Sequence, residues 1–139
     1  MNYEIEKDGK ILARYISASE AWGNDNLSFF SEDKEYIQAG SWNYSKGKKL
    51  LAHTHNEVER SVLFTQEVIF IKSGSLRAYI YDDDSNLVEE FTAYKDDILI
   101  MLSGGHGYEV LEDDTKVLEI KNGPYLGAEV DRDRLNLDG

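Results

Sequence analysis

The sequence predicts an all-β fold, and three observations point to it. Apolar and polar residues alternate with a period of two over most of the chain, the pattern of strands that bury one face. The alternating segments are short and rich in Val, Ile, Leu, Tyr and Phe, which favour strands. Turn-forming Gly, Ser, Asp and Asn separate them at intervals of about 8 to 12 residues, which is typical of an all-β sandwich or barrel.

Taken in order, these turns bound ten expected strands. The expected strands are residues 11–17, 35–44, 49–55, 60–64, 67–72, 76–81, 87–94, 97–102, 107–111 and 116–121. Only residues 18–26 lack the alternation, and we expect a short helical turn there, with Ser17 or Ser19 as its cap. The tail 128–139 alternates charged and apolar residues, which predicts a surface strand or an arm.

The composition predicts one domain over residues 1–139, with its barrel core at about 35–121. The 139 residues are 41% hydrophobic, enough for a single core. The net charge of −12 disfavours nucleic acid and membrane surfaces as partners. The chain has no cysteine, which excludes disulfides and thiolate ligands. No apolar leader or membrane span is recognisable, so we expect a cytoplasmic protein.

The three histidines predict a metal site. His53 and His55 would share one face of a strand, and His106 follows Gly104 and Gly105 in a turn. Glu67 opens an apolar strand, where alternation would turn its carboxylate toward the interior; a carboxylate there needs a metal, a cation or hydrogen bonds. Three imidazoles and one carboxylate suit a divalent transition metal. The alternatives are solvent-exposed imidazoles and a Glu67 that reaches water or pairs with Arg60 or Arg77.

These residues resemble the first motif of the cupin superfamily. Gly47, five residues, His53-Thr54-His55, then Glu67, six residues and Gly74 follow that motif, and residues 97–106 look like the second. The resemblance covers about residues 35–120. It implies a single-domain jelly-roll β-barrel, a dimer, and one metal in the barrel mouth. By position, the implied ligands are His53, His55, Glu67 and His106.

The chain departs from the cupin pattern in both motifs. Eleven residues separate His55 from Glu67, where the family has three or four, and this insertion contains the rival carboxylates Glu57 and Glu59. In the second motif Asp97 stands where Gly is usual and Ser103 where Pro is usual. His106 comes two residues early, and Glu109 stands at the place of the terminal Asn.

Several other residues are candidates for a substrate pocket. Arg77, Tyr79 and Tyr81 alternate on one face of their strand and could bind an anionic or sugar-like ligand, although an outer or subunit-packing face fits them equally. Tyr108 shares the face of His106 and is a pocket candidate. Tyr108 and Glu109 are the nearest acid–base candidates for catalysis.

Two functions fit these observations. The first is a metal-dependent enzyme, with Zn, Ni, Fe, Co or Mn, that isomerises or oxygenates a small polar metabolite such as a carbohydrate or carboxylate. The second is a non-catalytic sugar- or metabolite-binding module in which the metal anchors the ligand or stabilises the fold. A cupin resemblance supports the fold more strongly than any reaction. We expect a homodimer in either case.

Overall fold

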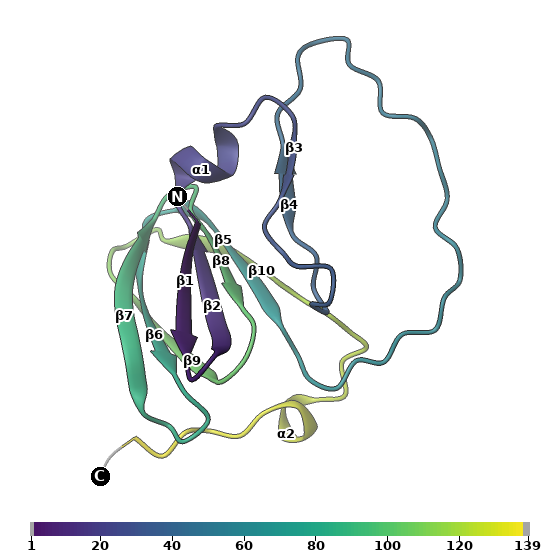
Figure 1. Ribbon diagram of the computed structural model, residues 1–139. Helices are drawn as coiled ribbons and strands as arrows, with labels where there is room; N and C mark the ends of the chain where they lie inside the picture. Colours follow the sequence, from purple (N-terminus) through teal and green to yellow (C-terminus); the bar gives the residue numbers. More distant parts are fainter. Residues whose placement is uncertain (1, 138–139) are drawn as a thin grey trace.

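Two antiparallel sheets face each other in the computed structural model, which describes residues 2–137 (Figure 1). The larger sheet has the order β1-β2-β8-β5-β10 and the smaller has the order β7-β6-β9. The larger sheet comprises β1 (Asn2–Lys7), β2 (Lys10–Ile16), β8 (Ile98–Met101), β5 (Glu67–Ser73) and β10 (Lys116–Lys121). The smaller comprises β7 (Leu87–Tyr94), β6 (Ser75–Tyr81) and β9 (Gly105–Val110).

The remaining elements are short. They are the hairpin of β3 (Leu27–Phe29) and β4 (Gly40–Trp42), and the helices α1 (Ala18–Trp22) and α2 (Ala128–Asp131). Within residues 2–137 no helix is long and apolar enough to cross a membrane. No sheet in this range closes on itself. The all-β class is therefore confirmed, and the jelly-roll barrel stays a prediction.

The main core fills the space between the two sheets. Ile71 of β5, Ala78 of β6 and Leu99 of β8 are fully buried there. In β6 the burial of the neighbouring residues alternates from Leu76 on, as a period of two requires. In β5 the first three residues are all buried, and in β8 all four are. β8 is buried on both faces because a second apolar cluster covers the outer face of the larger sheet under α1 and the chain that follows it.

Gly74 carries the chain from the larger sheet to the smaller one. It stands between β5 and β6 with φ +80°, and a Cβ there would collide with Thr115. Only glycine meets both conditions, because other residues rarely adopt this backbone conformation. The Glu67-to-Gly74 spacing is therefore the length of β5 plus its corner.

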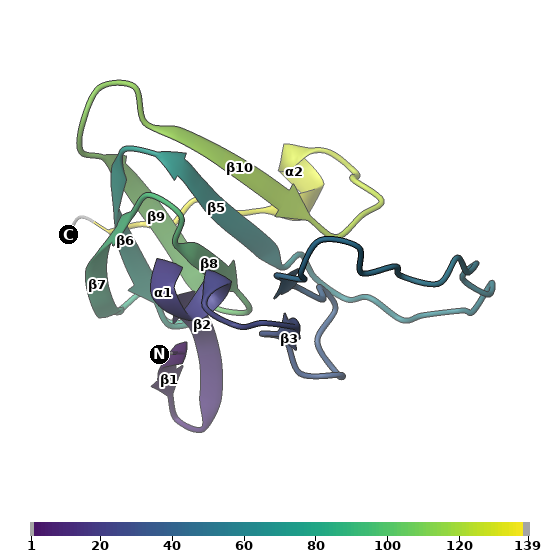
Figure 2. The same ribbon diagram turned by 90° about the horizontal axis from the view of Figure 1, so that it is seen from above.

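The segment between β4 and β5 is the main difference from the expected fold. The strands expected at 49–55 and 60–64 are wrong, and the one expected at 35–44 is reduced to β4. Residues 43–66 contain no strand and leave the sheets as a long excursion (Figures 1 and 2). A strand needs a partner for its backbone groups, and no described strand pairs with this segment. Leu51 and Leu63 are consequently 87% and 79% exposed.

The amino-terminal elements also differ in detail. The expected helical turn exists as α1, with Ser17 at its N-cap, but the Ser17 side chain forms no cap hydrogen bond. Asp97 accepts the hydrogen bond of the Ala18 N–H instead, at 2.7 Å. The tail is confirmed as an arm that begins with α2, while residues 138 and 139 lie outside the described range.

Candidate functional site

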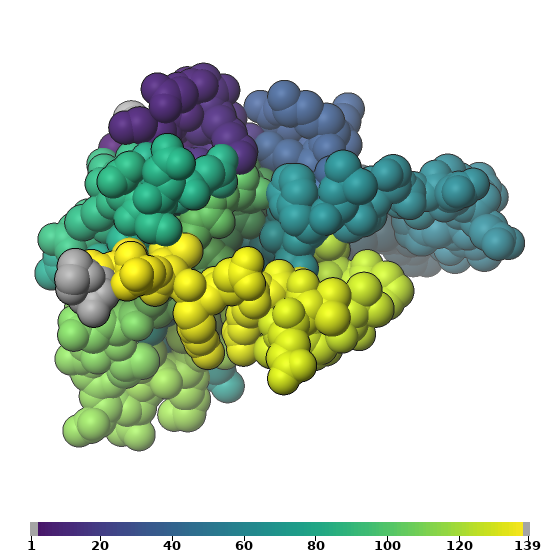
Figure 3. All heavy atoms as spheres, turned by 90° about the horizontal axis from the view of Figure 1, so that it is seen from below, coloured from purple at the N-terminus to yellow at the C-terminus, as the bar shows by residue number. Residues whose placement is uncertain are grey.

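A pocket of about 710 Å³ opens at one end of the two sheets. This volume lies within the usual range for small-molecule sites. The first residues of β5 and β9 and the end of β10 form its floor, and the carboxyl-terminal segment runs across it (Figure 3). The lining residues with ionisable side chains are Lys10, Glu67, Asp82, Asp83, His106, Tyr108, Glu119, Lys121, Asp131, Arg132, Asp133 and Arg134.

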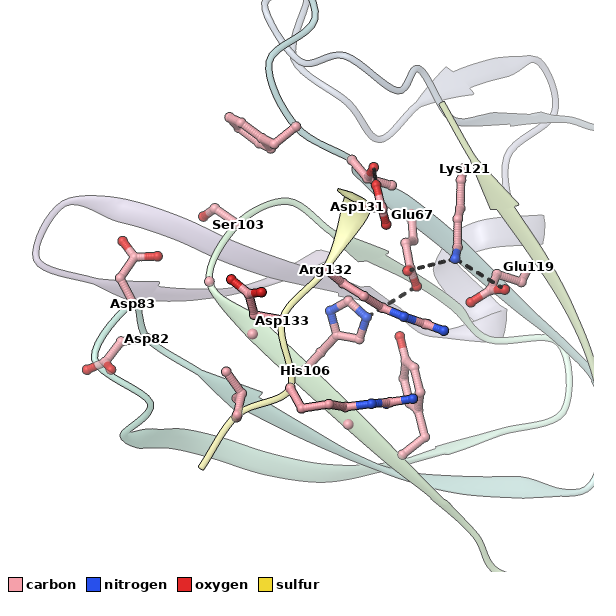
Figure 4. A pocket seen from close by; sticks show the side chains of 18 of the residues that line it. Glu67, Asp82, Asp83, Ser103, His106, Glu119, Lys121, Asp131, Arg132 and Asp133 are labelled. Carbon is pink, nitrogen blue, oxygen red and sulfur yellow. Dashed lines mark hydrogen bonds and ion pairs between the residues drawn. The ribbon is translucent and has the colours of Figure 1, made fainter. Parts of the chain in front are cut away.

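Glu67 and His106 meet in this pocket, as their strand positions predict. Glu67 shares the inner face of β5 with Ile69 and Ile71, both buried in the core. His106 in β9 pairs with Ile80 in β6, which is buried in the core. Period-two alternation therefore directs the carboxylate and the imidazole into the same space. His106 Nε2 lies 3.3 Å from Glu67 Oε1 (Figure 4).

His106 and Lys121 both contact the carboxylate of Glu67. Burial raises the pKa of its carboxyl, but His106 and Lys121 outweigh burial, so the pKa lies below its usual value. Lys121 Nζ is 3.8 Å from Oε2 and 3.9 Å from Glu119 Oε2. The contact with His106 has the distance of an ion pair but does not meet the geometry of a hydrogen bond. Oε1 consequently has no hydrogen-bond partner among the described residues, although it is buried.

Tyr108 brings a second unpartnered polar atom to the same place. Its hydroxyl is buried and finds no hydrogen-bond partner within residues 2–137. Its ring lies 5.5 Å from the His106 ring, between ring centres. Burial raises the pKa of Tyr108 well above its usual value, and the negative charges of Glu67 and Glu119 raise it further. The hydroxyl is therefore a neutral hydrogen-bond donor over the working pH range.

Tyr108→Phe is expected to leave the free energy of unfolding unchanged or to increase it by about 1 kcal/mol, because it removes a buried donor that has no partner. Urea denaturation of the free protein measures this. Tyr15→Phe is the matched control: the Tyr15 hydroxyl donates a 2.5 Å hydrogen bond to Asp97, so its loss should cost about 1–3 kcal/mol. Equal destabilisation by both substitutions would show that the Tyr108 hydroxyl has a partner after all.

The structure keeps the other two predicted ligands away from this pair. His53 and His55 lie in the exposed segment 43–66, with ring centres 5.0 Å apart. His53 Nδ1 is 3.0 Å from the carbonyl oxygen of Leu51, a local contact. In the described part of the chain no group of three or more histidines and carboxylates is arranged to hold a metal ion. The structure thus assembles two of the four predicted ligands.

The remaining site candidates lie outside the pocket, with Tyr108 as the exception. Arg77 and Tyr79 are not among the residues that line it. They lie on the outer face of β6, the alternative that the sequence left open, because the alternate residues of that strand fill the core. Glu109 in β9 pairs with Arg77 in β6 and is exposed on the same outer face. Glu57 and Glu59 are exposed in the segment 43–66.

Sequence reasoning missed nine charged residues of the pocket, and four of them matter most for its chemistry. Glu119 and Lys121 end β10, and Arg132 and Arg134 follow α2. The alternating charges of the tail were the available signal, but charge alternation also describes any solvated arm. Only the path of the chain across the pocket distinguishes these two interpretations.

No protein-family model, curated protein or solved structure matches the chain. The cupin resemblance therefore stays a prediction that rests on the sequence motifs. What the fold and the site define directly is a class: an antiparallel β protein with a polar pocket in which a buried glutamate contacts a partly buried histidine.

Proposed function

We propose that this chain is a cupin-like enzyme that binds one divalent transition metal (Zn, Ni, Fe, Co or Mn) and acts on a small polar metabolite. The ligands in this proposal are His53, His55, Glu67 and His106. One observation carries it: a buried carboxylate oxygen, Glu67 Oε1, has no hydrogen-bond partner among residues 2–137 and faces an imidazole nitrogen in a pocket. An unpartnered buried carboxylate oxygen is costly, and a metal would satisfy it.

The spacing of the pair supports this proposal. Two ligand atoms that each lie about 2.1 Å from one metal are about 3.0–3.4 Å apart in octahedral or tetrahedral geometry, and the observed separation is 3.3 Å. Carboxylate oxygen and imidazole nitrogen form a donor set that suits the first-row metals named above. Lys121 contacts the other oxygen, Oε2, so the lysine ammonium does not occupy the position beside Oε1.

The segment 43–66 is long enough to bring His53 and His55 to the pair. Twelve residues lead from His55 to Glu67, and a chain of that length reaches at most about 40 Å when extended. The segment also exposes apolar side chains, among them Leu51 and Leu63, which favours closure onto the body of the protein. We therefore include in the proposal that this segment closes over the pocket when metal binds.

The metal and the pocket residues would have different roles in binding the ligand and in the reaction. A bound metal supplies a Lewis acid for a carbonyl or hydroxyl oxygen of the ligand. Tyr108, held neutral by burial and by nearby carboxylates, donates a hydrogen bond to a ligand oxygen and can deliver a proton there. Lys121 keeps Glu67 and Glu119 from repelling an anionic ligand.

Metal analysis of purified variants tests the proposal. The wild-type protein is expected to hold about one metal per chain, and the double substitution His53→Ala/His55→Ala should remove it. Glu67→Gln should weaken metal binding at least tenfold, while Glu57→Gln and Glu59→Gln should have no effect. Both histidines are exposed, so the double variant should still fold, which circular dichroism would check. Full metal occupancy in the double variant would contradict the proposed ligand set.

The contacts of Glu67 with His106 and Lys121 favour one second candidate, a metal-free module that binds a small molecule without reaction. In that case Lys121 and His106 already stabilise the ionised carboxylate, and no metal is needed. The same analysis separates the candidates, because the module would contain no metal in any variant and would still bind its ligand.

A further inference from the structure

The carboxyl-terminal segment brings to the pocket two arginines that have no side-chain partner among residues 2–137. Arg132 and Arg134 both line it. From their position we infer that the pocket binds a small organic acid, whose carboxylate group is held by Arg132 and Arg134 and whose other oxygens face Tyr108 and His106. This inference deepens the proposed function by naming its substrate class, and it applies equally to the metal-free candidate.

Two contacts fix the segment across the pocket. Asp131, the last residue of α2, accepts a hydrogen bond from Thr65, which lies just before β5. Leu135 packs on Gly105 at the start of β9, so closely that a Cβ on Gly105 would lie 2.8 Å from Leu135 Cδ1. The arginines lie between these anchors, and Figure 4 shows Arg132 extended over the pocket among Glu67, His106 and Glu119.

The charges in the pocket leave these two guanidinium groups available. Lys10 is paired with Asp83 at 2.8 Å, and Lys121 bridges Glu67 and Glu119. Arg132 and Arg134 form no ion pair and no side-chain hydrogen bond with any residue in the range 2–137. The chain has 27 acidic and 15 basic residues, so carboxylate partners for an arginine are abundant. Two arginines at one pocket without such a partner among residues 2–137 therefore indicate a site for an anionic ligand.

Carboxylate is the anion that fits these groups best. A guanidinium group binds a carboxylate through two parallel hydrogen bonds. The pocket is also lined by Asp82, Asp83, Glu119, Asp131 and Asp133, whose charges would repel a doubly charged phosphate more strongly than a singly charged carboxylate. The buried Tyr108 hydroxyl needs an acceptor, which a hydroxy acid or sugar acid supplies with its hydroxyl oxygens.

Ligand binding to the metal-chelated full-length protein tests the inference. The probes are the monocarboxylates gluconate and glycerate, with glucitol and glycerol as their uncharged counterparts and inorganic phosphate as the competing anion. Isothermal titration calorimetry measures the dissociation constants. Each carboxylate probe should bind at least tenfold more tightly than its uncharged counterpart and than phosphate. Arg132→Gln/Arg134→Gln should weaken this binding at least tenfold. Arg77→Gln, which changes an arginine on the outer face of β6, should leave it unchanged.

The outcomes separate this inference from the proposed metal site. The double arginine variant should keep its metal content, and His53→Ala/His55→Ala should keep arginine-dependent gluconate or glycerate binding after chelation. Arginine-dependent binding in a protein that never holds metal would uphold the inference while the proposed function fails. The inference is overturned if neither acid binds more tightly than its uncharged counterpart, if phosphate binds as tightly, or if the double arginine variant binds like the wild type.

Discussion

Replacing Arg14 by methionine is expected to lower the free energy of unfolding by about 3–5 kcal/mol, the usual cost of breaking a buried ion pair. The Arg14 side chain is 2% exposed and that of Glu35 is 8% exposed. Two parallel hydrogen bonds of 2.6 Å join them. A third, of 2.8 Å, runs from Arg14 Nε to Glu4. Methionine would fill the volume of the arginine but leave the Glu35 carboxylate buried without a positive charge beside it, with the Glu32 N–H at 3.0 Å as its remaining donor.

Urea denaturation measures this effect, and the exposed pair of Lys10 and Asp83 is its control. That pair has a comparable distance, 2.8 Å, but its side chains are 50% and 66% exposed. Lys10→Met should therefore cost no more than about 1 kcal/mol, because water screens surface ion pairs. Comparable costs at the two sites would mean that burial is not the source of the effect at Arg14.

The double substitution Arg14→Met/Glu35→Leu separates the two contributions to that loss. Removing both charges abolishes the uncompensated carboxylate, so stability should recover by several kcal/mol relative to the single variant. Hydrogen bonding to Glu35 raises the pKa of Arg14, and burial works against it. This balance agrees with a pair whose strength comes from its geometry. A double variant as unstable as Arg14→Met would show that packing, not charge, holds the segment after α1 against the larger sheet.

The parts of the fold that the sequence predicted are those with strong local patterns. In β5 the alternation of Glu67, Ile69 and Ile71, followed by Gly74, defined the strand, its inner face and its end. In β9 the same reasoning placed His106 and Tyr108 on the inner face. One consequence is the Glu67–His106 pair, which joins residues 39 positions apart in the sequence.

The parts that the sequence did not predict depend on long-range partners. Residues 49–55 have strand-like alternation but no described strand to pair with, so a local pattern gave a wrong strand. β1 carries alternate charges and was not recognised, although it pairs with β2 along its whole length. Arg77 and Tyr79 alternate as well as any inner-face residues, and only the tertiary structure shows that their face is the outer one.

Asp97 stands where the motif of the proposed cupin resemblance would have glycine, and its contacts in the structure give it a role that glycine could not fill. Its buried carboxylate accepts hydrogen bonds from the Tyr15 hydroxyl at 2.5 Å, from the Ala18 N–H at 2.7 Å and from the Tyr94 N–H at 2.8 Å. One side chain thereby joins β2, α1 and the end of β7 to the start of β8. A glycine, which is usual at this place in the motif, would offer none of these acceptors.

Asp97→Ala is accordingly expected to reduce the free energy of unfolding by about 3–5 kcal/mol, because each of the three donors loses a bond to a charged acceptor. Asp97→Asn should cost less, since its amide oxygen can still accept one bond while its NH₂ group faces the Tyr94 N–H, another donor. Asp113→Ala, which removes an exposed carboxylate, should change stability by no more than about 0.5 kcal/mol. In urea denaturation Asp97→Ala should be the least stable of the three variants, Asp97→Asn intermediate and Asp113→Ala the most stable. A loss below about 1 kcal/mol for Asp97→Ala would mean that these contacts are not what joins α1 and β7 to the larger sheet.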